Sequence, residues 1–153
     1  MKGDVAIMEN INNFKIGVLS VLGMSGSVIA NLLGGWDMAL QTLVLFMAVD
    51  YMTGLIVAGV FKKSEKTETG ALESKAGWKG LFKKGVTLMI VLVATQLDKM
   101  TGTEIIRDAV IIGYAVNEAI SIIENAGLMG VPIPDIIKRT LEVLKNKDCS
   151  RDD

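Results

Sequence analysis

The sequence has no histidine and a single cysteine, Cys149, which lies in a polar C-terminal tail. One cysteine cannot form an intrachain disulfide, and it cannot supply the thiolates of a structural zinc site. We interpret Cys149 as a free thiol, with a reactive or lipidated thiol as the alternative. Because histidine, a nucleophile elbow, metal-ligand spacing and a phosphate-binding loop are all missing, the sequence offers no catalytic constellation. We therefore expect a protein that is not an enzyme and that needs no cofactor.

A large excess of charge is also missing, because 16 basic residues stand against 17 acidic residues for a net charge of −1. A dedicated nucleic-acid binder usually carries a strong basic excess, so that class of partner is not expected. Aromatic residues make up only 5% of the chain, yet 50% of the 153 residues are hydrophobic and the mean hydropathy is +0.44. The sequence therefore favours a single membrane domain, residues 1–153, with the lipid bilayer as its first partner.

Two long apolar runs occupy the first part of the chain. Residues 16–36 hold 21 residues without a charge, enough to cross a hydrocarbon core of about 30 Å as a helix. A cleaved signal peptide fits this segment less well, because Asp4 and Glu9 spoil the basic region expected before it. Gly34, Gly35 and Asp37 predict a tight turn, and residues 38–61 then form a second run that only Asp50 interrupts. We predict a membrane-spanning helix in each run.

A third apolar run covers residues 85–97, which is short for a membrane span. The predicted helix extends back to give a span over 80–98, because Lys83 and Lys84 can snorkel to the lipid headgroups. Thus the third span is expected to begin among lysines.

The fourth predicted span, residues 105–124, is the weakest of the set. Thr101 and Glu104 have the spacing of a capping box and predict a helix start near residue 102. The helix contains Arg107 and Asp108, as well as Glu118, so it is less apolar than the others.

The remaining chain, residues 125–153, is predicted to be a cytoplasmic tail. The sequence VPIP at 131–134 breaks the chain, and an apolar stripe at helical spacing follows it. The residues of this stripe are Ile136, Ile137, Thr140, Leu141 and Leu144. We predict an amphipathic tail helix.

Lysine sets the predicted topology. Residues 62–84 carry seven lysines against three glutamates, so the positive-inside rule places the loop 62–79 in the cytoplasm. Four spans would leave both termini in the cytoplasm, whereas three spans would leave one basic terminus outside. We therefore expect an all-α, multi-pass membrane protein with four spans, and with three as the alternative.

Asp50 requires an explanation in this topology, because a charge near the bilayer midplane costs about 2.5–3.5 kcal/mol. It is either protonated or faces protein or water. Gly54 and Ala58 follow it on the same helical face, and small residues let another helix approach closely. The predicted helix-packing or pore face comprises Asp50, Thr53, Gly54, Ala58, Gly113, Asn117, Glu118 and Ser121. Two interpretations stay open: simple helix packing, or a water-accessible or self-associating surface.

A second group of residues is predicted to lie at the membrane surface: Ser74, Gly77, Trp78, Gly80, Lys83 and Lys84. A charged loop of this kind either is solvated and only fixes topology, or contacts anionic headgroups. Trp78 supports an interfacial position, because indole rings favour the membrane boundary.

Three segments in order carry a family resemblance. They are D-x-x-T-G from Asp50 to Gly54, SKAGWKGLFKK at 74–84, and NEAISIIENAGLMGVPIP at 117–134. Over roughly residues 38–145 the chain resembles the toxin-secretion/phage-lysis holin family. The resemblance implies a small multi-pass protein of the bacterial cytoplasmic membrane that oligomerises and opens lesions, so that an endolysin reaches the cell wall or a toxin is released. It carries over no catalytic residue, and the motif positions come without an assigned role.

Two other functions stay open at this stage. A small proton-coupled transporter would use Asp50 and Glu118 as its intramembrane carboxylates. A membrane adaptor would bind its partners through the basic loop and the tail. For a holin, we hypothesise that the charge of Asp50 tunes assembly.

Overall fold

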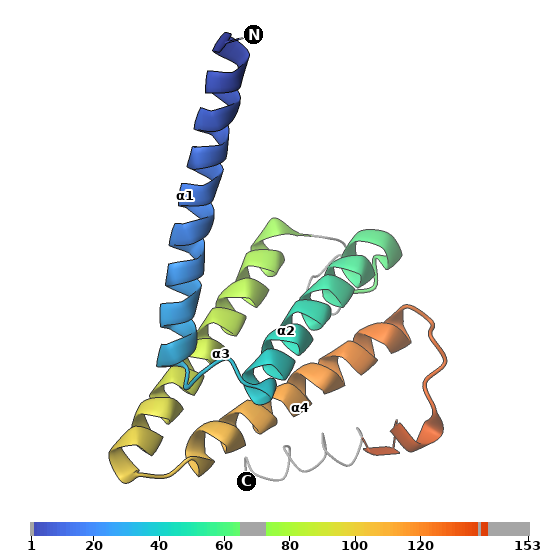
Figure 1. The fold of residues 1–153 in the computed structure, drawn as a ribbon. Helices are drawn as coiled ribbons and strands as arrows, with labels where there is room; N and C mark the ends of the chain where they lie inside the picture. Colours follow the sequence, from blue (N-terminus) through green and yellow to red (C-terminus); the bar gives the residue numbers. More distant parts are fainter. Residues whose placement is uncertain (1, 65–72, 138, 141–153) are drawn as a thin grey trace. The chain divides into compact units, whose positions relative to one another are not determined.

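The computed structural model describes residues 2–64, 73–137 and 139–140, and within them the regular secondary structure is entirely helical (Figure 1). The elements are α1 (Lys2–Leu32), α2 (Met38–Ile56), a short π-helix η1 (Val57–Phe61), α3 (Ser74–Thr101) and α4 (Ile105–Leu128). The prediction of an all-α protein is thus confirmed. The chain divides into two compact units, Met1–Asp37 and Met38–Asp153.

The first unit consists of α1 and the turn that ends it. The N–H of Gly35 donates to the carbonyl of Ala30 at 2.8 Å, and the N–H of Gly34 donates to that of Asn31 at 3.2 Å. These bonds form a Schellman motif, which needs a left-handed residue after the helix. Gly34 meets this need with a φ of 91°. The glycine pair therefore stops the helix where the sequence predicts a turn.

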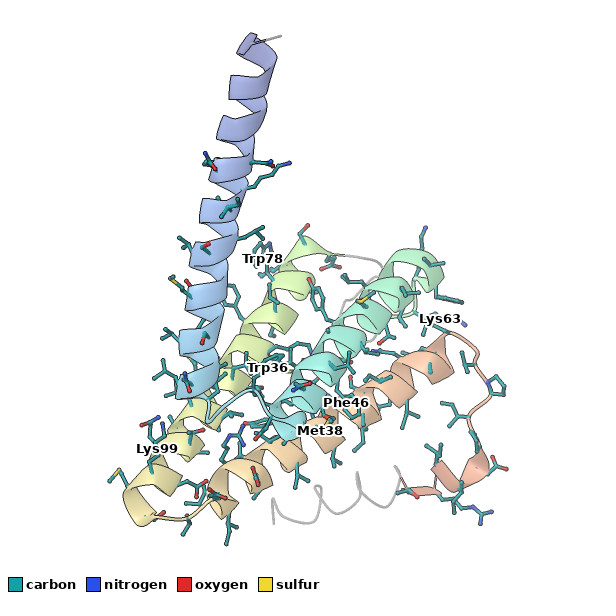
Figure 2. The ribbon with its side chains drawn as sticks, viewed as in Figure 1. Trp36, Met38, Phe46, Lys63, Trp78 and Lys99 are labelled. Carbon is teal, nitrogen blue, oxygen red and sulfur yellow. The ribbon has the colours of Figure 1, made fainter. Side chains whose placement is uncertain are left out.

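In the second unit, α4 packs along both α2 and α3, and its contacts with α2 are the most extensive (Figure 1). The apolar residues buried between these elements are Leu40, Leu43, Met47, Val57, Ala58, Val91, Ala94 and Ile111. Figure 2 shows that large side chains also project outward from all of these helices. Many of the exposed ones are apolar, including Leu45, Met52 and Met89. A surface of this kind is stable in lipid rather than in water.

Three helical segments of the described chain are long and apolar enough to cross a membrane: Asn12–Leu32, Met38–Phe61 and Ser74–Thr101. They correspond to the first three predicted spans. The segment formed by α2 and η1 has the same bounds as the second predicted span, residues 38–61. Helix α4 is not among these segments, so the fourth span stays a prediction.

Helix α3 starts earlier than the sequence suggests. The predicted loop runs to residue 79, whereas the helix begins at Ser74 and continues without interruption to Thr101. The lysines of its first turns recur every four residues, at 75, 79 and 83, and so share one side of the helix without burial. A basic segment can therefore be helical and still remain exposed.

Helix α4 ends in a second Schellman motif, in which the N–H of Val131 donates to Ala126 at 3.0 Å and Gly130 has a φ of 85°. After Pro134, residues 135–137 and 139–140 are again helical. Leu141, Leu144 and Cys149 lie outside the described residues, so most of the predicted tail helix stays a prediction.

Candidate functional site

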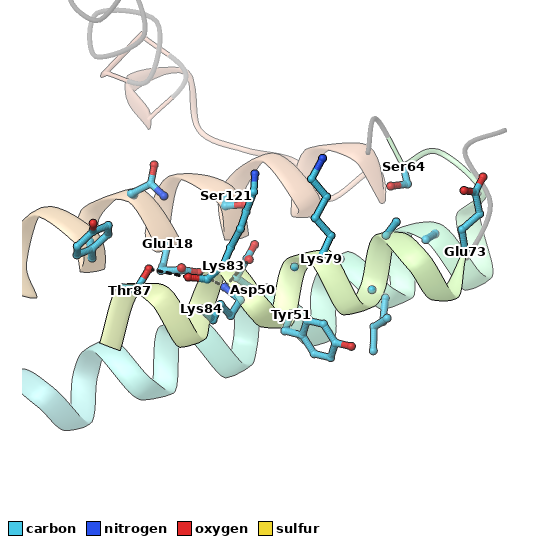
Figure 3. A pocket seen from close by; sticks show the side chains of 18 residues that line it. Asp50, Tyr51, Ser64, Glu73, Lys79, Lys83, Lys84, Thr87, Glu118 and Ser121 are labelled. Atoms are coloured by element: carbon cyan, nitrogen blue, oxygen red, sulfur yellow. Dashed lines mark hydrogen bonds and ion pairs between the residues drawn. The ribbon is translucent and has the colours of Figure 1, made fainter. Parts of the chain in front are cut away.

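Asp50 of α2 lies at the contact of three helices. Its Oδ2 atom accepts a hydrogen bond from Lys84 Nζ of α3 at 2.9 Å, and the same ammonium pairs with Glu118 Oε2 of α4. Figure 3 shows the three side chains meeting from three different helices. Only 8% of the side-chain surface of each carboxylate is exposed, and 13% of that of Lys84. We call Asp50, Lys84 and Glu118 the charged triad.

Asn125 of α4 holds the other side of Asp50. Its Nδ2 atom donates to Asp50 Oδ1 at 3.1 Å and to Thr53 Oγ1 at 3.0 Å. The hydroxyl of Thr53 in turn donates to the Asp50 carbonyl at 3.0 Å. Both carboxylate oxygens of Asp50 therefore have partners from a neighbouring helix.

Asn125 is not part of the predicted face, although it donates a hydrogen bond to Asp50. The available signal is its spacing, because it follows Glu118 by seven residues and so lies on the same helical face. Gly54 faces this amide, and a Cβ there would stand 3.8 Å from Asn125 Nδ2, at ordinary contact distance. Gly54, one helical turn after Asp50, thus lies opposite the Asn125 amide that donates to Asp50.

The triad ties the three helices together electrostatically. Desolvating ions is costly, and their attraction repays this cost only if the geometry is good and the remaining polar atoms are satisfied. Here one ammonium serves two carboxylates, so the ionised triad would carry a net charge of −1. No group of three or more potential metal ligands occurs among the residues that the structure describes. Both ion pairs of the site share the ammonium of Lys84.

A pocket of about 540 Å³ opens beside the triad between α2, α3 and α4. Six of the eight residues of the predicted face line it: Asp50, Gly54, Ala58, Asn117, Glu118 and Ser121. Thr53 is not in the pocket lining but accepts a hydrogen bond from Asn125, whereas Gly113 is exposed and a Cβ there would meet open space. The structure thus gathers most of the predicted face at one pocket.

The residues predicted to lie at the membrane surface do not share one environment. Ser74 begins α3, and Trp78 is exposed with its ring centroid 6.1 Å from that of Phe82. Gly77 and Gly80 face Tyr51 of α2, whose Oη atom would lie 3.6 Å from a Cβ on Gly77. Tyr51 of α2 thus lies beside the first turns of α3, at an ordinary contact distance from both positions.

The two adjacent lysines have different roles. Lys83 is exposed and lines the pocket, whereas Lys84 points into the bundle and pairs with the triad carboxylates. The expectation that Lys84 snorkels to the headgroups is therefore wrong. Successive helical residues differ in direction by about 100°, so one of two neighbours can face solvent while the other is buried.

Asp98, at the end of α3, caps α4. Its carboxylate accepts hydrogen bonds from the N–H of Arg107 at 2.7 Å, the N–H of Ile106 at 3.1 Å and the hydroxyl of Thr103 at 2.5 Å. The predicted capping box is wrong, because Glu104 makes no side-chain capping bond and α4 begins at Ile105. The left-handed Gly102, with a φ of 71°, turns the chain so that Asp98 reaches these groups.

The chain has relatives along most of its length. The model of the bacteriophage holin family matches residues 27–146. An uncharacterised 14.9 kDa protein of Clostridium perfringens, from the 3′ region of nagH, is 39% identical over 143 residues, which make up 92% of this chain and 99% of the relative. An uncharacterised protein of Listeria innocua is 38% identical over 134 residues, or 87% of each chain. A probable holin of Bacillus phage phi105 is 30% identical over 108 residues, or 70% of this chain and 74% of the phage protein.

No solved structure shows a significant match to the chain. The matched residues include all three segments that carry the resemblance in the sequence, together with the charged triad and Asn125. The resemblance is thereby confirmed, and the chain belongs to the bacteriophage holin family.

Proposed function

We propose that this protein is a holin that oligomerises in the bacterial cytoplasmic membrane and opens lesions through which an endolysin or a toxin leaves the cell. The match to the holin family over residues 27–146 carries this proposal. The 30% identity to a probable phage holin supports it.

The distribution of polar residues in α4 agrees with a membrane environment. This helix buries Arg107, Ile111, Glu118 and Asn125, while its large apolar residues Ile105, Ile112 and Val116 are exposed. Three of the four buried side chains are polar and three large exposed ones are apolar, which reverses the usual pattern of a soluble helix. In the proposed assembly the exposed side contacts lipid or another subunit.

The orientation follows from the exposed lysines. The end of η1 and the start of α3 lie at the same end of the second unit (Figure 1). Lys62 and Lys63 are exposed there, as are Lys75, Lys79 and Lys83. We place this end on the cytoplasmic side by the positive-inside rule. With four spans, both termini are then cytoplasmic.

Gly113 is the proposed contact point between subunits. It is exposed on α4, and no side chain or neighbouring backbone lies within 4 Å of the position of its Cβ. Small residues on a lipid-facing helix allow a second helix to approach closely. Association here would bring the exposed Asn117 close to the interface and add a polar group to it.

A proton-coupled transporter is the second candidate, because the carboxylates of Asp50 and Glu118 both line a pocket of about 540 Å³. Such a protein would move a solute without gross leakage. A membrane adaptor, acting through the basic segment and the tail, is the third candidate. Neither has the support of a named relative.

The deciding experiment is inducible expression in a bacterium that holds an endolysin in its cytoplasm. Lysis is followed by optical density, and leakage by release of a folded cytoplasmic enzyme. Abrupt lysis after a delay, with release of the enzyme, is the expected result. Loss of membrane potential without enzyme release would contradict large lesions. Healthy cells, with the protein recovered from the membrane fraction, would contradict the holin proposal and favour a transporter or an adaptor.

A further inference from the structure

Two lysines beside the charged triad are not used by it. Lys79 and Lys83 are one helical turn apart on α3, both are exposed, and both line the pocket. Figure 3 shows their side chains extending from α3 in the direction of α4. Within the described part of the chain, neither ammonium forms an ion pair, whereas Lys84 is held by two carboxylates. The pocket lining therefore contains two ammonium groups, those of Lys79 and Lys83, that the triad does not use.

Besides the lysines, the two triad carboxylates and Glu73, the polar side chains of the pocket lining are uncharged. The hydroxyls of Tyr51, Ser64 and Ser121 and the amide of Asn117 all belong to it. The carboxylates of Asp50 and Glu118 are turned to Lys84, and Glu73 lies at the start of α3. Because the ionised triad would carry a net negative charge, the interior disfavours a second anion. The site therefore suits a ligand with one anionic group near the lysines and a neutral polar group further in.

The aromatic neighbours of the lysines indicate where this pocket lies. Trp78 and Phe82 directly precede Lys79 and Lys83, and 62% and 70% of their surfaces are exposed. Tryptophan favours the level of the lipid headgroups. The first turns of α3 thus present an aromatic row and a lysine row side by side.

We propose that Lys79 and Lys83 bind the phosphodiester of an anionic phospholipid whose polyol headgroup, such as glycerol, enters the pocket between α2, α3 and α4. The phosphate lies between the two ammonium groups, and the headgroup hydroxyls meet the hydroxyl and amide groups of the lining. This binding requires that α3 lies in the membrane, but it does not require lesion formation. Failure of lipid binding and failure of the holin proposal are therefore separate results.

The test uses the full-length protein with Trp36 replaced by phenylalanine, so that Trp78 is the only tryptophan. The protein is reconstituted into phosphatidylcholine vesicles that contain either brominated phosphatidylglycerol or brominated phosphatidylcholine. Bromine quenches Trp78 on contact, so the ratio of the two quenching curves gives the lipid preference. We expect a clear preference for phosphatidylglycerol, and K79Q/K83Q should lower it by roughly tenfold.

The matched control is K63Q/K75Q, which removes two charges from the same end of the unit at positions outside the pocket. It should keep most of the preference, and K79R/K83R should keep it as well because both cations remain. Circular dichroism checks that each variant is helical. Equal losses in K79Q/K83Q and K63Q/K75Q would show general surface attraction and overturn the site, as would the absence of any preference in the parent. Displacement by low concentrations of inorganic phosphate would assign the site to a soluble anion and overturn the lipid proposal.

Discussion

Lys84 of α3 and Asp50 of α2 are 34 residues apart in the sequence, and 2.9 Å separates Nζ of the first from Oδ2 of the second. The same ammonium also contacts Glu118 of α4. One lysine thus joins three helices of a proposed membrane bundle, and its removal takes the shared cation from two carboxylates.

Replacing Lys84 with methionine should destabilise the second unit strongly. Breaking a buried ion pair by removing one partner costs about 3–5 kcal/mol, because the remaining charge stays buried without compensation. Titration of the purified protein from mild detergent into sodium dodecyl sulfate, followed by circular dichroism, measures the loss. The control is Lys99→Met, at an exposed position of the same helix, which should change stability by less than about 0.5 kcal/mol.

A neutral triad separates the lost attraction from the buried charge that remains. The variant D50N/K84M/E118Q removes all three charges, and replacing a whole buried ionic group is often close to neutral. We expect it to recover most of the stability that Lys84→Met loses in the same titration. A triple variant as unstable as Lys84→Met would show that the charges of the carboxylates are not the cause.

The charge of Asp50 should affect the time of lysis. Asp50→Asn leaves Lys84 paired with Glu118 and weakens the tie between α2 and α3. We therefore expect earlier lysis at equal protein level, measured by optical density in cells that contain the endolysin. Glu104→Gln removes an exposed carboxylate and serves as the control. Normal timing and dose in the Asp50 variant would show that ionisation of Asp50 is irrelevant.

Asn125 should matter more than the neighbouring amide of α4. Asn125→Ala removes the donor to Asp50 Oδ1 and Thr53 Oγ1, and leaving buried acceptors unsatisfied costs about 1–3 kcal/mol. Asn117→Ala, eight residues earlier and exposed, should stay within about 0.5 kcal/mol of the parent. The same detergent titration compares the two. Equal losses would contradict a specific role of Asn125.

Asp98 should protect the first turn of α4. Asp98→Ala removes the acceptor for the N–H groups of Ile106 and Arg107, and losing a capping residue costs about 0.5–2 kcal/mol. Hydrogen exchange of these two amides should become faster in the variant. Glu104→Ala, which removes no side-chain capping bond, should leave their exchange unchanged. Slow exchange in the Asp98 variant would mean that other groups cap the helix.

A bulky residue at Gly113 should block subunit contact without harming the fold. Gly113→Leu adds a side chain to open space on α4, so we expect normal insertion but delayed or absent lysis. Gly85→Leu is the matched control, because Gly85 of α3 also faces open space. Chemical cross-linking measures oligomers directly. Unchanged oligomers and timing in the Gly113 variant would place the interface elsewhere.

The sequence by itself determined which stretches of the chain are helical, although α3 and α4 begin at other residues than predicted. Uncharged runs predict the spans because every backbone polar group in lipid must be bonded internally, which a helix achieves. Glycine at positive φ ends α1 where the pattern predicts a turn, and Pro134 separates α4 from the tail. Asp50 and Glu118 are also visible as polar residues in apolar surroundings.

Only the tertiary structure decided which groups these polar residues meet. Helical periodicity shows that residues share a face, but it contains nothing about which neighbouring helix that face contacts. Lys84 is one of several lysines at the start of α3, and it turns inward because α2 and α4 each bring a carboxylate to it. Asn125 and Asp98 likewise have partners far away in the sequence or beyond a turn. Their roles depend on how the helices pack, which local sequence patterns do not specify.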